Sequence, residues 1–279
     1  MAWQRLSQRA NGQGPDGPHE GVPDHLVHGV VDWFNTVVGY TRTSMLDHDL
    51  VRLLATRMQL ALPRKALGGM EIRLALMSQA TSDDEFCLDL VDCTLATAGS
   101  ANNQNEWLSV LLAEGGSVWQ VSDDLDALTR VVAGEAKDSY TAAVTTNDPA
   151  SEELRTAWKN AYGRNGDPSD AWDHAIKALE HLLIPVVVSS KAKATLSDVV
   201  GTLRRNDGNK WRCSLPGKDE TNDVAPLVGT LELIWPNTVD RHGGSAANRP
   251  PTAAEARTVV SLTVALVQAH RVEPIVYKV

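Results

Sequence analysis

The chain has little of what marks a membrane, secreted or metal-binding protein. It contains no run of 18 apolar residues, so we expect no membrane-spanning helix. Residues 1–20 are polar and rich in glycine and proline, which predicts a disordered arm rather than a signal peptide. The three cysteines, Cys87, Cys93 and Cys213, do not have the spacing of metal ligands. We expect Cys87 and Cys93 to share one helix as small core residues of a cytoplasmic protein.

Motifs that identify common enzymes are also missing from the first half of the chain. It has no glycine loop for phosphate, no HExxH pair and no Gly-x-Ser-x-Gly elbow. No carboxylate or histidine stands at metal-ligand spacing from His25, His28 or His48. We expect these three histidines to be surface residues of amphipathic helices. We therefore expect neither a metal nor a cofactor.

What the sequence does contain is helical periodicity over most of its 279 residues. It predicts an all-α fold with two helical domains, an acidic one over residues 21–148 and a four- to five-helix bundle over 149–272. A short tail, 273–279, follows. Residues 1–149 carry 10 basic and 20 acidic side chains, whereas residues 150–279 carry 16 and 15, so the net negative charge lies in the first half. The composition changes at Asn147–Ser151, where we place the boundary.

Individual elements follow from local signals. One apolar stripe predicts a helix through Leu26, Val30, Trp33, Phe34 and Val37. Polar and apolar residues alternate over 117–121, which predicts a strand and a short hairpin near Trp119. We expect a long helix from Asp123 or Asp124 to Ala143, and a helix from Pro168 that ends at Pro185. Capping boxes are predicted at Ser82–Glu85, Thr195–Asp198 and Thr252–Glu255. The last of these begins a helix that is apolar on most sides, and it should be the central helix of the bundle.

The strongest candidate for chemistry is the turn just before that helix. Arg241 and His242 stand side by side between Pro236 and Gly243-Gly244. Histidine can move protons near neutral pH, and arginine fits a phosphate. His242 could therefore act as general acid or base on a phosphodiester while Arg241 stabilises the developing charge. Asn237 and Asp240 are close enough in sequence to orient them. In the alternative, Arg241 pairs with an acidic residue such as Glu180, and His242 hydrogen-bonds a loop carbonyl.

A second feature is a basic stretch. Residues 186–218 contain seven basic side chains and only two acidic ones, Asp198 and Asp207. The candidates for binding an RNA backbone are Lys191, Lys193, Arg204, Arg205, Lys210 and Arg212. The alternative is a solvated surface with scattered charges.

Several short motifs in the second half resemble one family. They are Ala157-Trp158-(x)3-Tyr162-Gly163, Asp167-Pro168-Ser169-(x)-Ala171, Ala175-Ile176-Lys177-Ala178-Leu179-Glu180, Ala194-Thr195-Leu196, Trp235-(x)5-Arg241-His242-Gly243 and Glu255-Ala256. In this order they look like the HEPN-like, or abortive-infection C-terminal, domain of bacterial and prophage proteins. The resemblance covers about residues 150–271. Gly21-Val22-Pro23 before Trp33 resembles the helical domain often found upstream.

The resemblance implies a bundle that dimerises and, in active members, cleaves RNA as a toxin or phage-defence effector. Active members carry an Arg and a later His with four to six residues between them. Here His242 matches the His, the positions for the Arg hold Trp235, Pro236 and Asn237, and Arg241 would have to replace it. The motif is thus incomplete. Expected partners are a second copy, RNA, and a phage or antitoxin protein. The alternative function is a non-catalytic interaction module that binds a protein or nucleotide.

Overall fold

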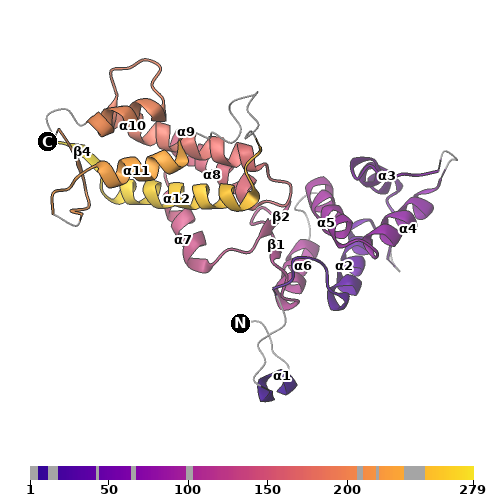
Figure 1. Ribbon diagram of the computed structural model, residues 1–279. Helices are drawn as coiled ribbons and strands as arrows, with labels where there is room; N and C mark the ends of the chain where they lie inside the picture. The colour runs from indigo at the N-terminus through magenta and orange to yellow at the C-terminus, as the bar shows by residue number, and fades with distance from the viewer. Residues whose placement is uncertain are drawn as a thin grey trace. The chain divides into compact units, whose positions relative to one another are not determined.

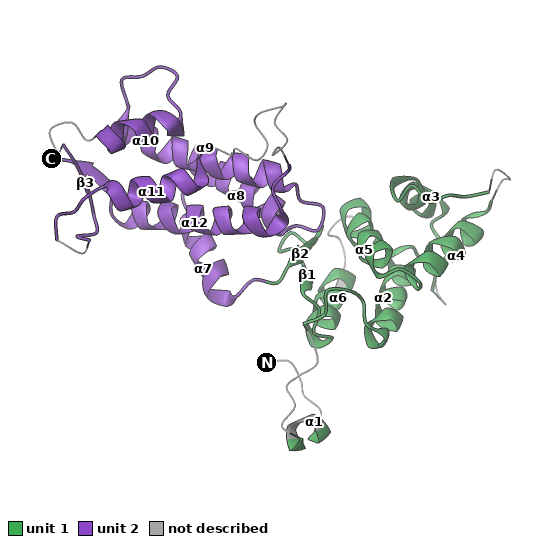
Figure 2. Cartoon of the chain, viewed as in Figure 1, with its two compact units in different colours: residues 1–131 green, residues 132–279 purple. Residues whose placement is uncertain are grey.

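The computed structural model of the protein describes residues 6–11, 18–41, 44–63, 67–98, 103–205, 210–217, 220–235 and 249–279. Within them the chain is mostly helical, with two small two-stranded sheets (Figure 1). This confirms the predicted all-α class with a short hairpin. The chain divides into two compact units, residues 1–131 (unit 1) and 132–279 (unit 2) (Figure 2).

Unit 1 is built from helices whose apolar stripes meet in one core. Its elements are α1 (Leu6–Ala10), α2 (Asp24–Val37), α3 (His48–Arg57), α4 (Gly69–Ala80), α5 (Asp84–Ala98), α6 (Asn103–Glu114), β1 (Trp119–Val121) and β2 (Leu128–Arg130). The predicted stripe on α2 is confirmed at Leu26, Val30, Trp33 and Phe34, which are all buried. Cys87 and Cys93 do share α5.

The hairpin near Trp119 has a second strand where a helix was expected. The long helix predicted from Asp123 or Asp124 to Ala143 is wrong, because Leu128–Arg130 pairs antiparallel with Trp119–Val121. The buried carboxylate of Asp92 on α5 accepts the backbone N–H of Leu128 at 2.6 Å. A partner 36 residues away thus selects the strand, which local periodicity could not show.

Unit 2 is a helical bundle with one small sheet. Its elements are α7 (Gly134–Ala143), α8 (Pro149–Tyr162), α9 (Pro168–Val187), α10 (Leu196–Arg205), β3 (Trp211–Cys213), α11 (Ala225–Ile234), α12 (Ala253–Val272) and β4 (Val276–Lys278). Helix α12 packs against α7, α8 and α9, as the prediction of a central helix requires (Figure 1). The side chains of Asp148 and Asp167 cap the N-termini of α8 and α9.

Both ends of unit 2 differ from the predicted domain limits. The units divide before α7 rather than at residues 148/149, because α7 packs against α12. The expected tail, 273–279, contains β4, which pairs antiparallel with β3. In the predicted arm, 1–20, residues 6–10 are helical and His19 forms a parallel bridge with Ser117.

Two local predictions need correction. Pro185 lies inside α9 and not at its end, since a proline in the last turns removes only one backbone bond. The box predicted at Ser82–Glu85 is replaced by an Asp83 cap, whose carboxylate accepts the N–H of Phe86 at 3.1 Å. On α3, Val51 and Leu54 are buried, whereas Leu53 is 44% exposed.

The turn that joins α8 to α9 has no room for a Cβ at two glycines. On Gly163 a Cβ would lie 2.5 Å from the carbonyl oxygen of Lys159. A Cβ on Gly166 would lie 2.0 Å from the carbonyl oxygen of Asn160, and this neighbour is backbone that cannot rotate away. The same turn is closed by the N–H of Asp167, which donates to the Asn160 side chain at 3.2 Å. The close approach therefore fixes how α8 and α9 pair.

We predict that Gly166→Ala lowers the free energy of unfolding by about 1–3 kcal/mol, the usual cost of overpacking. Gly229→Ala is the matched control, because a Cβ there meets no atom within 4 Å in the middle of α11. The control should be neutral or stabilising by about 1 kcal/mol. Urea denaturation of both variants checks this, and equal stabilities would contradict it.

Candidate functional site

The four residues predicted to act in catalysis, Asn237, Asp240, Arg241 and His242, lie outside the described residues. The structure describes both flanks of their segment: α11 and Trp235 before it, and Arg249 with the start of α12 after it. The candidate site is therefore built from these flanks.

The first flank is fixed at the end of α11. Ile234 is fully buried, and its carbonyl accepts a hydrogen bond from the indole Nε1–H of Trp172 at 2.8 Å. Trp172 lies in the second turn of α9 and is itself buried. The backbone N–H of Trp235 donates to Leu231 at 2.8 Å, which closes the helix. The chain thus leaves α11 at a fixed point beside the first turns of α9.

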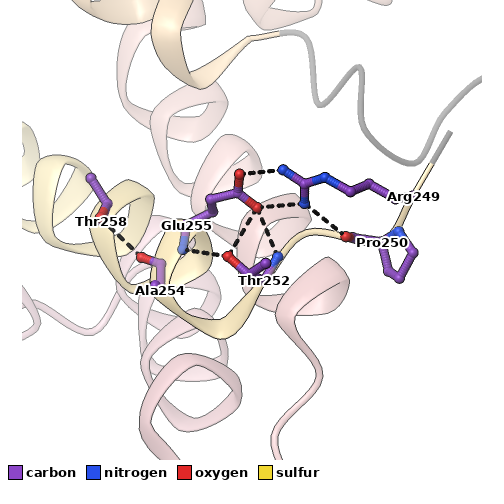
Figure 3. A network of polar contacts seen from close by, with 6 residues as sticks. All are labelled: Arg249, Pro250, Thr252, Ala254, Glu255 and Thr258. Carbon is purple, nitrogen blue, oxygen red and sulfur yellow. Dashed lines mark hydrogen bonds and ion pairs between the residues drawn. The ribbon is translucent and has the colours of Figure 1, made fainter. Parts of the chain in front are cut away.

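The second flank is a network of polar contacts at the start of α12 (Figure 3). The predicted capping box is confirmed: Glu255 N–H donates to Thr252 Oγ1 at 3.2 Å, and Thr252 N–H donates to Glu255 Oε2 at 2.8 Å. Arg249 adds what the sequence did not predict, a two-pronged ion pair to the same carboxylate at 2.8 and 2.5 Å. These hydrogen bonds, that of Arg249 foremost, lower the pKa of Glu255 to about 2.

Both flanks belong to one end of unit 2. The hydroxyls of Tyr162, at the end of α8, and Ser261, in α12, lie 3.0 Å apart. Helix α9 starts just after Tyr162, and Trp172 holds the end of α11 there. The last turn of α8, the first turns of α9 and α12 and the end of α11 therefore gather at this end of the bundle.

Glu180, the partner considered for Arg241, has a defined role in the bundle. Its Oε1 accepts the backbone N–H of Leu196, the first residue of α10, at 2.8 Å. The Asp198 carboxylate completes the cap by accepting the N–H of Thr195 at 3.0 Å. Glu180 thus holds the start of α10 against α9.

Three of the six predicted RNA-binding residues are brought together by the structure. Lys191, Arg204 and Arg205 line a surface hollow of about 500 Å³ beside the end of α9. Lys193 is exposed in the loop before α10, whereas Lys210 and Arg212 belong to the β3 region and do not line the hollow.

Much of the charge in this basic hollow is already paired. Lys191 forms an ion pair with Asp198 at 2.5 Å, and Arg204 pairs with Glu232 on α11. Arg205 is exposed and forms no ion pair with a described residue. The hollow also stands apart from the flanks of the Arg241-His242 segment, since Trp172 and Val188 are separated by roughly 25 Å along α9.

The structure also shows a His–Glu pair and a second hollow, neither of which was predicted from the sequence. On α9 and α8, His174 Nδ1 lies 2.5 Å from Glu153 Oε2. A second hollow, of about 510 Å³, is lined by Tyr162, Ala254, Arg257, Thr258, Ser261 and Leu262. Arg257 forms no hydrogen bond or ion pair with any residue that the structure describes. Each arrangement joins α8 to a later helix, so no local motif could reveal it.

Comparisons with known proteins give no family: no protein-family description, curated protein or solved structure matches this chain. Over the parts of the chain that the structure covers, no helix is long and apolar enough to cross a membrane. Across the same ranges, no three His, Cys, Asp or Glu side chains gather as metal ligands would.

We predict a pH signature for the Glu255 network. The pKa of the Glu255 carboxyl is 4.5 in the unfolded chain and about 2 in the folded protein. The ionised carboxylate therefore stabilises the fold fully at a pH above 4.5, and this contribution is lost as the pH falls toward 2. Glu255→Gln should therefore lower the melting temperature most at pH 6, and the difference from wild type should shrink between pH 4.5 and 2.

Glu152→Gln is the control, since this carboxylate is exposed at the start of α8 and no ion pair of it is seen with described residues. Thermal denaturation at several pH values measures both variants. A Glu255→Gln difference that is the same at every pH would refute the assigned ion pair.

Proposed function

We propose that this protein is a HEPN-like, cytoplasmic protein of the phage-defence or toxin type that cleaves RNA without a metal. His242 acts as general acid or base, Arg241 stabilises charge on the phosphorus, and Asn237 and Asp240 orient them. The proposal includes a homodimer, in which each subunit supplies one Arg-His pair, and a phage or antitoxin protein as a further partner.

The observation that carries the proposal is the anchoring of both flanks of the Arg241-His242 segment. The Trp172–Ile234 hydrogen bond holds one flank, and the Arg249–Glu255–Thr252 network holds the other. Catalytic groups work when rigid elements support them, and both supports here are helix ends: Ile234 lies in the core, and the Arg249–Glu255 pair lies at the surface. The incomplete family motif makes Arg241, rather than an earlier residue, the guanidinium to test.

The basic hollow supports the same function by offering charge to an RNA backbone. It lies roughly 25 Å along α9 from the anchored end, a distance that several nucleotides span at ~3.4 Å each. The two parts would therefore contact different phosphates of one strand. The hollow would hold the strand, and the Arg-His pair would act on one bond.

We predict that His242→Ala and Arg241→Ala each reduce the rate of RNA cleavage by about 10²- to 10⁴-fold, the usual contribution of such groups. His181→Ala is the matched control, because His181 is exposed on α9 and is assigned no role. Cleavage of labelled single-stranded RNA is followed in the presence of EDTA, and circular dichroism confirms that each variant folds.

Equal loss of activity in His181→Ala and His242→Ala would remove His242 from the reaction. A wild-type protein that cleaves none of a panel of RNAs would sink the nuclease and favour the alternative, a non-catalytic module that binds a protein or nucleotide. Sedimentation of the purified protein measures the dimer separately.

The pairing of charges in the basic hollow predicts unequal effects on RNA binding. Arg205→Ala should reduce the dependence of log K on log salt by about 0.7, the value for one single-strand phosphate contact. Lys191→Ala should change it less, because Lys191 is already paired with Asp198. Fluorescence anisotropy with labelled RNA at 50–200 mM salt measures both, and an unchanged slope in Arg205→Ala would rule this residue out as a phosphate contact.

A further inference from the structure

The hollow between α8 and α12 has the features of a small anion site. Its volume of about 510 Å³ falls within the range of ligand pockets, roughly 300–1,000 Å³. Among its lining residues, Arg257 carries the charge and no carboxylate is present. Arginine is always charged and its guanidinium fits a phosphate.

The contrast with the basic hollow shows why this guanidinium is more available. Lys191 and Arg204 are each paired with a carboxylate, whereas Arg257 is half-buried and has no described partner. The nearest acidic residue in the sequence is Glu255, whose charge is held by Arg249 and by the cap of α12. The first turns of α12 also bear the positive end of the helix dipole.

The hydroxyl groups of the hollow complement the guanidinium. Tyr162 and Ser261 share a hydrogen bond of 3.0 Å, and when Tyr162 is the donor the Ser261 hydrogen is left for a ligand oxygen. The Tyr162 ring packs at a tilt of 35° against Trp158, with ring centroids 4.2 Å apart, and Trp158 in turn stacks on Tyr140 at 4.2 Å. The wall of the hollow is thus fixed before any ligand arrives.

The remaining lining residues are Ala254, Thr258 and Leu262, and the Thr258 hydroxyl donates to the Ala254 carbonyl at 2.9 Å. Ala254, Leu262 and the Tyr162 ring offer a surface for an organic group, and the volume exceeds the need of a bare ion. A guanidinium, hydroxyls and an apolar wall together fit a phosphate ester that carries a sugar or base.

We propose that the hollow formed by Tyr162, Arg257, Ser261 and Leu262 binds the phosphate of a nucleotide, with Arg257 as its charged contact. The phosphate belongs either to a free mononucleotide or to an RNA strand. The RNA source rests on the proposed function, since the hollow lies at the same end of the bundle as the flanks of the Arg241-His242 segment. The mononucleotide source is independent of it.

Calorimetric titration of the full chain tests the site with three probes: inorganic phosphate, adenosine 5′-monophosphate and a single-stranded RNA decamer. Arg257→Met keeps the aliphatic stem and removes the charge, so it should weaken binding of the phosphate-bearing probe by about ten- to hundredfold. Ser261→Ala should weaken it by about three- to tenfold. Lys177→Ala, which removes an exposed positive charge from α9, is the control and should leave affinity within about twofold.

Four outcomes test the site. Arg257-dependent binding of the mononucleotide assigns a nucleotide pocket, and Arg257-dependent binding of RNA alone assigns a strand contact; both support the site. Absence of binding by every probe, or equal loss in Lys177→Ala, overturns it.

The RNA titrations use the His242→Ala protein, so that cleavage does not interfere. Arg257-dependent binding with no cleavage by wild type would leave the phosphate site standing while the nuclease fails. Cleavage by wild type with unchanged binding in Arg257→Met would do the reverse.

Discussion

Unit 2 depends on the burial of α12 among α7, α8 and α9. Four valines of this helix, Val259, Val260, Val264 and Val267, are at most 5% exposed. Each buried side chain of this size stabilises the fold by about 1.5–3 kcal/mol relative to an exposed one. Because α7, α8 and α9 all pack against α12, the position of α12 determines how these three helices are arranged. The hollow between α8 and α12 depends on that arrangement.

Polar contacts at the two ends of α12 keep it from sliding in this apolar environment. At the start, Glu255 binds Thr252 and Arg249. At the end, the Arg271 guanidinium donates to both carboxylate oxygens of Asp148, at 2.9 and 3.0 Å, and to Ser151 at 2.8 Å. Asp148 also caps α8, so one carboxylate joins the end of α12 to the start of α8. Directional bonds of this kind fix the register that hydrophobic burial leaves open.

The sequence predicted the elements whose causes are local. The Thr252–Glu255 box and the α2 stripe involve residues three or four positions apart, so periodicity and spacing identify them. The strand at Leu128 and the assignment of α7 to unit 2 failed because their causes, Asp92 and α12, are distant in sequence. The same limit applies to the Tyr162–Ser261 contact, which joins residues 99 positions apart. The catalytic prediction at Arg241 and His242 falls outside the described residues and remains a prediction.

Whether a basic side chain can bind a phosphate depends on whether the fold has already paired it with a carboxylate. By sequence alone, residues 186–218 are the most basic stretch, because they contain seven basic residues and only two acidic ones. The fold changes this balance, because Asp198 comes from α10 and Glu232 from α11 to neutralise Lys191 and Arg204. Near Arg257 the fold does the opposite: it commits the neighbouring Glu255 to the helix cap and leaves the guanidinium among hydroxyls. Among the described residues, no carboxylate pairs with Arg257, whereas an anion that binds Lys191 must displace Asp198. A stretch rich in basic residues is therefore not the same as a cation that is free to bind an anion. The second property depends on which helices the fold brings together.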